Sequence, residues 1–159
     1  MKLLVTMLLA IISMSAEARL GENITQCDQR YNSTGANLSV DQMDYISKLI
    51  TGLNTTNVVY RYDGWKIHIG YLNGYAVVME YSRLDNKDID ASQARMIMNV
   101  NCPGETWTKE GYMTWVGSNG TIFKKKVLKV RLESALYARF VGGQKKILQQ
   151  SVPVPGGSL

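Results

Sequence analysis

The chain has 159 residues, of which 45% are hydrophobic and 19% are charged, and its formal net charge is +5. This balance is typical of a globular domain, and it excludes a disordered chain, which would have fewer apolar and more charged residues. The length suits one domain. It excludes a multidomain enzyme, a TIM barrel and a large dinucleotide-binding fold.

The first 18 residues have the pattern of a secretory signal peptide. Lys2 precedes an apolar run from position 3 to 14, and Ala16-Glu17-Ala18 is a small-x-small cleavage site. The pattern predicts a mature chain that begins at Arg19 and is secreted or periplasmic. The run is shorter than the roughly 20 apolar residues of a spanning helix, so we expect no transmembrane segment in the mature chain.

Basic residues are concentrated in the second half of the chain. Residues 19–104 contain 8 basic and 9 acidic side chains, whereas residues 105–159 contain 9 basic and 3 acidic ones. The basic half could contact an anionic surface or be a solvated face without a partner. The expected partner is an envelope protein or an anionic polymer. Nucleic acid is not expected, because the chain is exported and has no nucleic-acid-binding motif.

The mature chain contains two cysteines, Cys27 and Cys102. Export permits a disulfide between them, which would stabilise the fold by about 3–5 kcal/mol in the chain-entropy model. The alternative is a pair of buried free thiols, because cysteine is among the most buried residue types.

Five Asn-x-Ser/Thr sequons occur among the ten asparagines of the chain. They begin at Asn23, Asn32, Asn37, Asn54 and Asn119. In a eukaryotic secretory pathway they would accept glycans, and in a bacterium they would carry no such meaning.

The residue pattern predicts helices alternating with groups of strands. Helices are expected at 25–31, 39–53, 90–99 and 134–141, with Thr25, Ser39 and Asp88 or Asp90 as N-terminal caps. Strands are expected at 58–62, 65–72, 75–82, 112–116, 121–125 and 127–132. Gly142-Gly143 should end the last helix, and residues 144–159 are predicted to be a disordered tail.

Asn73-Gly74 predicts a two-residue hairpin turn. Such a turn pairs Leu72 with Tyr75 and Tyr71 with Ala76, and continued pairing places Ile69 opposite Val78. The expected core face consists of Trp65, Ile67, Ile69, Tyr71, Ala76 and Val78. The opposite face consists of Lys66, His68, Tyr75, Val77, Met79 and Tyr81. Tyr75 and Tyr81 are therefore candidates for a binding surface.

No catalytic motif is evident. The single histidine, His68, excludes a His/Cys zinc cluster with more than one histidine, and nucleotide-binding glycine motifs and a nucleophile elbow are absent. We therefore expect no catalytic residue, cofactor or metal. The remaining catalytic hypothesis is a carboxylate-dependent hydrolase of cell-wall glycan. It would use acids from the sets Asp85, Asp88 and Asp90, or Glu105 and Glu110.

Four basic side chains are further binding-surface candidates: Lys124, Lys126, Lys129 and Arg131. They could bind an anion, or they could protect an edge strand from unwanted pairing.

Three motifs occur in order along the chain: Cys27-Asp28-Gln29-Arg30-Tyr31, the stretch 60–67, and the Asn73-Gly74 hairpin. With these motifs the chain resembles small secreted proteins of unknown function from verrucomicrobial-type bacteria. Asn32 stands where that family has glycine, and Cys102 is additional. The resemblance implies a bacterial host and carries over no functional residue. The layout is also similar to periplasmic domains of the outer-membrane assembly lipoprotein BamE and of β-lactamase inhibitor proteins, which bind proteins.

The sequence thus predicts an α+β domain over residues 19–143, with helices packed on an antiparallel meander sheet and two related α-β-β halves. The expected function is that of an exported, non-catalytic binding domain. The alternatives are the cell-wall hydrolase and a eukaryotic secreted glycoprotein.

Overall fold

The computed structural model describes residues 19–32, 35–37 and 55–151. The predicted signal peptide and the predicted helix at 39–53 lie outside the described residues. Three helices are described: α1 (Ile24–Arg30), α3 (Ala91–Asn101) and α4 (Ala135–Ser151). The described strands are β1 (Ala36–Asn37), β2 (Thr55–Tyr62), β3 (Trp65–Leu72), β4 (Tyr75–Arg83), β5 (Trp107–Gly111), β6 (Thr114–Gly117), β7 (Ile122–Lys125) and β8 (Lys129–Glu133).

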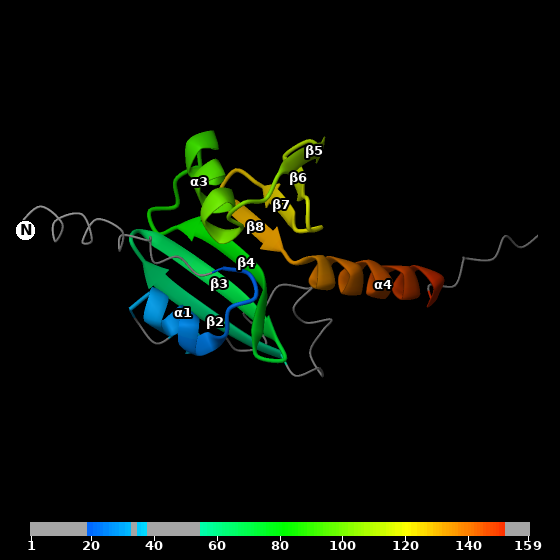
Figure 1. Ribbon diagram of the computed structural model, residues 1–159, viewed down its shortest axis with the longest axis horizontal. Coiled ribbons are helices and arrows are strands. Elements are labelled where there is room, and N and C mark those ends of the chain that lie inside the picture. Colours follow the sequence, from blue (N-terminus) through cyan, green and yellow to red (C-terminus); the bar gives the residue numbers. More distant parts are fainter. Residues whose placement is uncertain (1–18, 33–34, 38–54, 152–159) are drawn as a thin grey trace, which may run out of the picture.

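The strands form one antiparallel sheet in the order β1-β2-β3-β4-β8-β7-β6-β5. Each half of the chain contributes a helix followed by an antiparallel meander, and the last strands of the two halves, β4 and β8, pair in the middle of the sheet (Figure 1). The α+β class and the meander architecture predicted from the sequence are confirmed.

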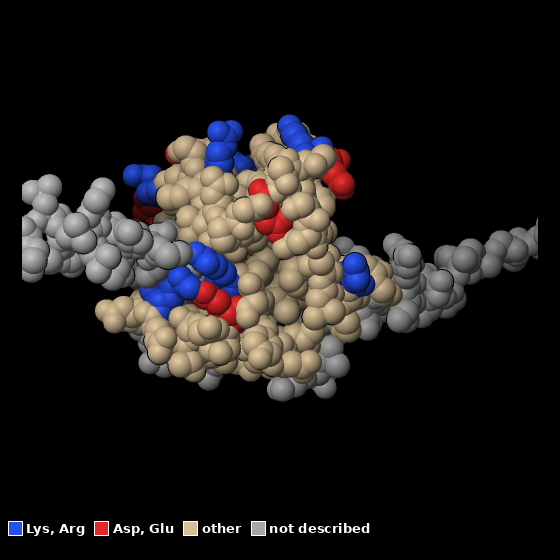
Figure 2. Space-filling model, viewed as in Figure 1, with Lys and Arg blue, Asp and Glu red and all other residues tan. Residues whose placement is uncertain are grey.

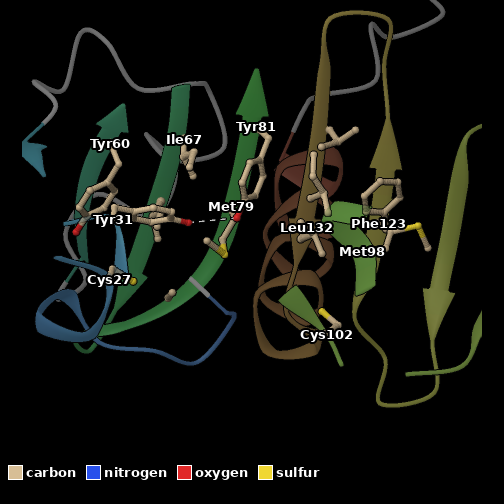
Figure 3. Packing of buried hydrophobic residues seen from close by; sticks show 14 of the residues in the cluster. Cys27, Tyr31, Tyr60, Ile67, Met79, Tyr81, Met98, Cys102, Phe123 and Leu132 are labelled. Atoms are coloured by element: carbon tan, nitrogen blue, oxygen red, sulfur yellow. Dashed lines mark hydrogen bonds between the residues drawn. The ribbon is translucent and has the colours of Figure 1, made fainter. Parts of the chain in front are cut away.

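The main hydrophobic core lies between one face of the sheet and the helices α1 and α3. Cys27 and Tyr31 from α1 and its end pack into the same cluster as Ile97 and Met98 from α3 (Figure 3). The sheet contributes alternate residues of β2, β3, β4, β7 and β8 to this cluster. Burial of this set on one face is what fixes the register of the strands, because a slip of one residue would expose it.

A chain of buried hydroxyl and amide groups crosses this core. The Tyr81 hydroxyl donates to Oδ1 of Asn101 at 2.9 Å and lies 3.3 Å from the Tyr31 hydroxyl. The Asn101 amide nitrogen donates to the carbonyl oxygen of Ile97 at 2.7 Å. Strand β4 is thereby connected to both helices that cover it, which satisfies polar groups that would be costly to bury alone.

Both helices of the main core begin with a capping box. Asp90 caps α3 by accepting from the backbone N–H of Gln93, as one of the two predicted caps. The first helix begins one residue earlier than predicted, since Asn23 accepts from the backbone N–H of Gln26 and Thr25 is inside the helix. The Asn-x-x-Gln spacing carried this signal.

The register of the β3–β4 hairpin differs from the prediction beyond the turn. Leu72 pairs with Tyr75 and Tyr71 with Ala76 as predicted, but Gly70 pairs with Val78 and Ile69 with Met79. Strand β4 therefore contains one extra residue, Val77, which is a β-bulge.

This bulge reverses the faces of the rest of β4. Met79 and Tyr81 turn into the main core, whereas Val78 turns to the opposite face. Tyr81, a predicted binding-surface residue, is only 4% exposed, so this prediction is wrong. The physical reason is that side chains alternate between the two faces of a strand, so one inserted residue moves every later side chain to the opposite face.

The last helix is longer than predicted. It continues through Gly142 and Gly143 to Ser151, so residues 144–151 are helical and the predicted disordered tail does not begin at 144. Each glycine destabilises a helix by about 1 kcal/mol relative to alanine, and α4 continues despite this cost. Tyr137 and Val141 pack with Val77 and Val78 in a second, smaller core on the other face of the sheet.

Candidate functional site

A line of polar and basic side chains crosses the sheet on the face opposite the main core. Cross-strand pairs join Arg61 to Lys66, Lys66 to Ser82, and Ser82 to Lys129. We call these four residues the basic row. Neighbouring strands are about 4.8 Å apart, so the row spans roughly 14 Å over β2, β3, β4 and β8.

The basic row lies in a groove with a volume of about 380 Å³. Its lining residues are Arg61, Lys66, His68, Glu80, Ser82, Arg83, Leu84, Asn86, Leu128 and Lys129. Helix α4 covers the other end of this sheet face, where the Arg131 guanidinium donates to the Tyr137 hydroxyl at 3.0 Å. The groove thus lies beyond the part of the face that α4 covers.

One carboxylate, that of Glu80, lines the groove. It accepts from Nζ of Lys129 at 2.8 Å, and Arg131 lies 3.8 Å from its other oxygen. Arg83 forms its ion pair with Asp85, outside the row. Glu80 is therefore shared by two cations at the β8 side of the groove.

At the β2 side of the groove, two cations face each other. Arg61 and Lys66 are directly opposite on antiparallel strands, a pairing of like charges that destabilises a sheet. Within the described part of the chain, neither residue is in an ion pair. An anion bound between them would relieve this repulsion.

The structure brings three of the predicted basic residues onto this face. Lys129 lines the groove, Arg131 lies beside it, and Lys124 pairs with Arg131 across β7 and β8. Lys124 donates to Glu133 at 2.7 Å, which neutralises its charge. Lys126 follows β7, is exposed and does not line the groove. Tyr75 is 57% exposed at the Asn73-Gly74 turn and also lies outside the groove lining.

Sequence analysis did not select Arg61, Lys66 and Ser82 as site residues. The signal for the first pair was local, because a tight turn at Asp63-Gly64 places Arg61 opposite Lys66.

The two cysteines are buried free thiols, so the structure does not form the predicted disulfide. They lie in different parts of the core: Cys27 is on α1, below the rings of Tyr31 and Tyr60, and Cys102 follows α3 (Figure 3). Burial raises the pKa of Cys27 to about 11 and that of Cys102 to about 12. Such thiols are protonated at neutral pH and are poor nucleophiles.

Three of the five carboxylates of the hydrolase hypothesis, those of Asp85, Asp90 and Glu105, have structural partners. Asp85 accepts two hydrogen bonds from the Arg83 guanidinium, which holds its pKa well below the usual range. Hydrogen bonds from Ser92 and from the backbone of Gln93 lower the pKa of Asp90. Glu105 accepts from the backbone N–H of Asn119 at 3.2 Å. A carboxyl group that acts as a general acid needs a raised pKa, whereas the pKa values of Asp85 and Asp90 are both lowered.

Two sequon asparagines have defined local roles. Asn23 is the cap of α1, and Asn119 lies exposed in the turn between β6 and β7. The Oδ1 atom of Asn119 accepts from the backbone N–H and the hydroxyl of Thr121, at 2.8 and 2.6 Å. Asn54 lies outside the described residues.

The described residues contain neither a group of metal ligands nor a helix suited to span a membrane. Among them, no three His, Cys, Asp or Glu side chains are grouped so as to hold a metal ion. No helix of this part of the chain has the length and apolarity needed to cross a bilayer.

Comparison of the chain with protein-family models, with curated proteins and with solved structures finds no match. The inferences below therefore depend on the geometry of this chain alone.

Proposed function

We propose that this chain is an exported binding domain whose basic row holds an anionic polymer. The observation that carries the proposal is the pairing of Arg61 with Lys66, two cations placed face to face without an ion pair in the described residues. A binding anion is the simplest source of the missing compensation, because opposite charges within a few ångströms offset the repulsion.

The shape of the site favours an extended ligand over a compact one. The basic row runs across four strands, and its cations are spaced along the groove on this sheet face. A polymer with repeated phosphate, sulfate or carboxylate groups can contact Arg61 and Lys66 at one end and Lys129 at the other. The predicted export of the chain would place such a surface where cell-envelope polymers occur.

The experiment measures binding of the purified chain to polyphosphate and to dextran sulfate at low and at moderate salt. The test variant is Arg61→Ser/Lys66→Ser. A basic residue near an anionic surface contributes about 1 kcal/mol, so the loss of two should weaken binding by roughly thirtyfold. The affinity of the unsubstituted chain should also fall with rising salt, because bound counterions are released on binding.

The matched control is Lys126→Ser/Arg139→Ser, which removes the same charge from exposed positions outside the groove lining. It should weaken binding only a few-fold. Equal losses in both variants would mean that net charge and not the basic row determines binding, and the proposed site would then be refuted. An unsubstituted chain that binds neither polymer would refute the proposed function.

Export is tested separately by the intact mass of the protein secreted by its native host. We expect a chain that begins at Arg19 without added sugar. Retained signal residues would contradict cleavage, and hexose-scale additions at sequons such as Asn119 would favour the eukaryotic glycoprotein.

A further inference from the structure

A second hollow lies between α3 and the strands β5, β6 and β7. Its volume is about 310 Å³. The lining residues are Ala91, Ala94, Arg95, Met98, Asn99, Trp107, Trp115, Phe123 and Lys125. We call it the aromatic hollow. None of these residues lines the groove of the basic row.

The hollow exists because small side chains face large ones. Helix α3 presents Ala91 and Ala94, while the sheet presents the rings of Trp107, Trp115 and Phe123. Both indoles meet the Phe123 ring edge to face, with centroid distances of 6.2 and 5.7 Å. The rings therefore support one another and form a preformed apolar wall.

One polar atom of this wall is unsatisfied. Nε1 of Trp107 is buried and has no hydrogen-bond partner among the described residues. A buried N–H without a partner costs about 1–3 kcal/mol, and nearly all such groups in folded proteins are paired. The atom has almost no accessible surface, so a ligand in the hollow does not reach it with the indole in this orientation.

The charged side chains that line the hollow are basic. Arg95 and Lys125 are lining residues, and Lys109 lies over the Trp115 ring with Nζ 6.0 Å from its centroid. No acidic side chain of the described residues lines the hollow. On the face drawn in Figure 2, basic side chains lie over α3, whereas the β5–β6 hairpin has both basic and acidic side chains.

From the apolar wall and the two lining cations, we infer that the aromatic hollow binds a small amphipathic acid, an acyl chain or ring with one carboxylate. A volume of about 310 Å³ equals that of roughly ten water molecules at about 30 Å³ each, which is the size of a ten-carbon acyl chain. The apolar body would lie against the rings, and the carboxylate would lie between Arg95 and Lys125. This inference does not depend on the basic row.

The test uses decanoate as the probe, with decanol as its uncharged counterpart. Below micellar concentrations, decanoate should change the tryptophan fluorescence saturably, and decanol should bind at least tenfold more weakly. In a ¹⁵N spectrum, the indole N–H signals of Trp107 and Trp115 should shift as decanoate fills the hollow, because both rings line it. Arg95→Gln/Lys125→Gln should lower decanoate affinity at least tenfold and leave decanol affinity unchanged.

A blocking variant and its control complete the test. Ala91→Leu adds a side chain to the lining at an exposed helix position and should abolish binding. Ser92→Leu adds the same group at an exposed neighbour outside the lining and should bind as the unsubstituted chain does. The inference is overturned if decanoate gives no saturable response, or if Arg95→Gln/Lys125→Gln and Ala91→Leu both bind it as the unsubstituted chain does. Unchanged affinity for polyphosphate in Ala91→Leu would show that the basic row is a separate site.

Discussion

Replacing Tyr81 by phenylalanine tests the register of the sheet and the buried polar chain together. The substitution removes the hydroxyl that donates to Asn101 at 2.9 Å and that lies 3.3 Å from the Tyr31 hydroxyl. Asn101 is 3% exposed, so no water can replace the donor without rearrangement of the core.

A buried acceptor left without its donor costs about 1–3 kcal/mol. Since a domain of this size loses about 2–4 °C in Tm per kcal/mol, Tyr81→Phe should lower Tm by roughly 2–12 °C. Thermal and urea unfolding, both followed by circular dichroism, measure the change. The urea m-value should be unchanged, because the surface exposed on unfolding is the same.

The matched control is Tyr75→Phe, which makes the same chemical change at a position that is 57% exposed. It should alter the free energy of unfolding by less than about 0.5 kcal/mol. If the two variants were equally stable, the Tyr81 hydroxyl would be solvated, as in the register without a bulge, and the described packing would be refuted. A double-mutant cycle with Asn101→Leu should give a coupling of about 0.5–3 kcal/mol.

Four further predictions concern other parts of the fold. Gly142→Ala and Gly143→Ala should each stabilise α4 by about 0.5–1 kcal/mol, seen as higher helicity in far-UV circular dichroism, because a Cβ at either position meets nothing within 4 Å; lower helicity would contradict a continuous helix. Cys27 and Cys102 should resist iodoacetamide at pH 8 until the chain is unfolded, and modification in the native state would contradict their burial. Since their folded pKa values of about 11 and about 12 exceed the usual value of 9.0, the stability they contribute is fully present below pH 9 and is lost as pH rises through 11 and 12; a pH-independent free energy of unfolding across that window would oppose this. Gly70→Ala should destabilise the bulge by about 1–3 kcal/mol in urea unfolding, because its Cβ would lie 2.6 Å from Val78, and an unaffected midpoint would argue against this approach of the strands.

Local signals in the sequence predicted much of the fold. The Asn73-Gly74 turn, the Asp90 cap and the alternation in β3 each depend on residues a few positions apart, and the structure contains all three. The bulge at Val77 has no comparable signal. It is favoured by the packing of Met79 and Tyr81 under two helices, which is a tertiary effect.

The candidate site was harder to predict because its parts meet through distant pairing. Lys129 was selected from the sequence, but Ser82 and Lys129 become neighbours only when β4 pairs with β8, with α3 and three strands between them in the chain. The aromatic hollow likewise needs α3 to lie over β5, β6 and β7. Its lining residues come from four separate elements, so no local pattern in the sequence marked them as one site.

Among the described strands, β4 and β8 form the single pair that joins the two meanders. Each meander is built from neighbouring strands, whereas this pair closes a long loop and should form late in folding. Until it forms, both strands have an unpaired edge, and an identical edge on a second chain offers the same partner. At high concentration, refolding can therefore yield dimers in which two chains exchange their second halves, linked through α3, while every native contact is preserved.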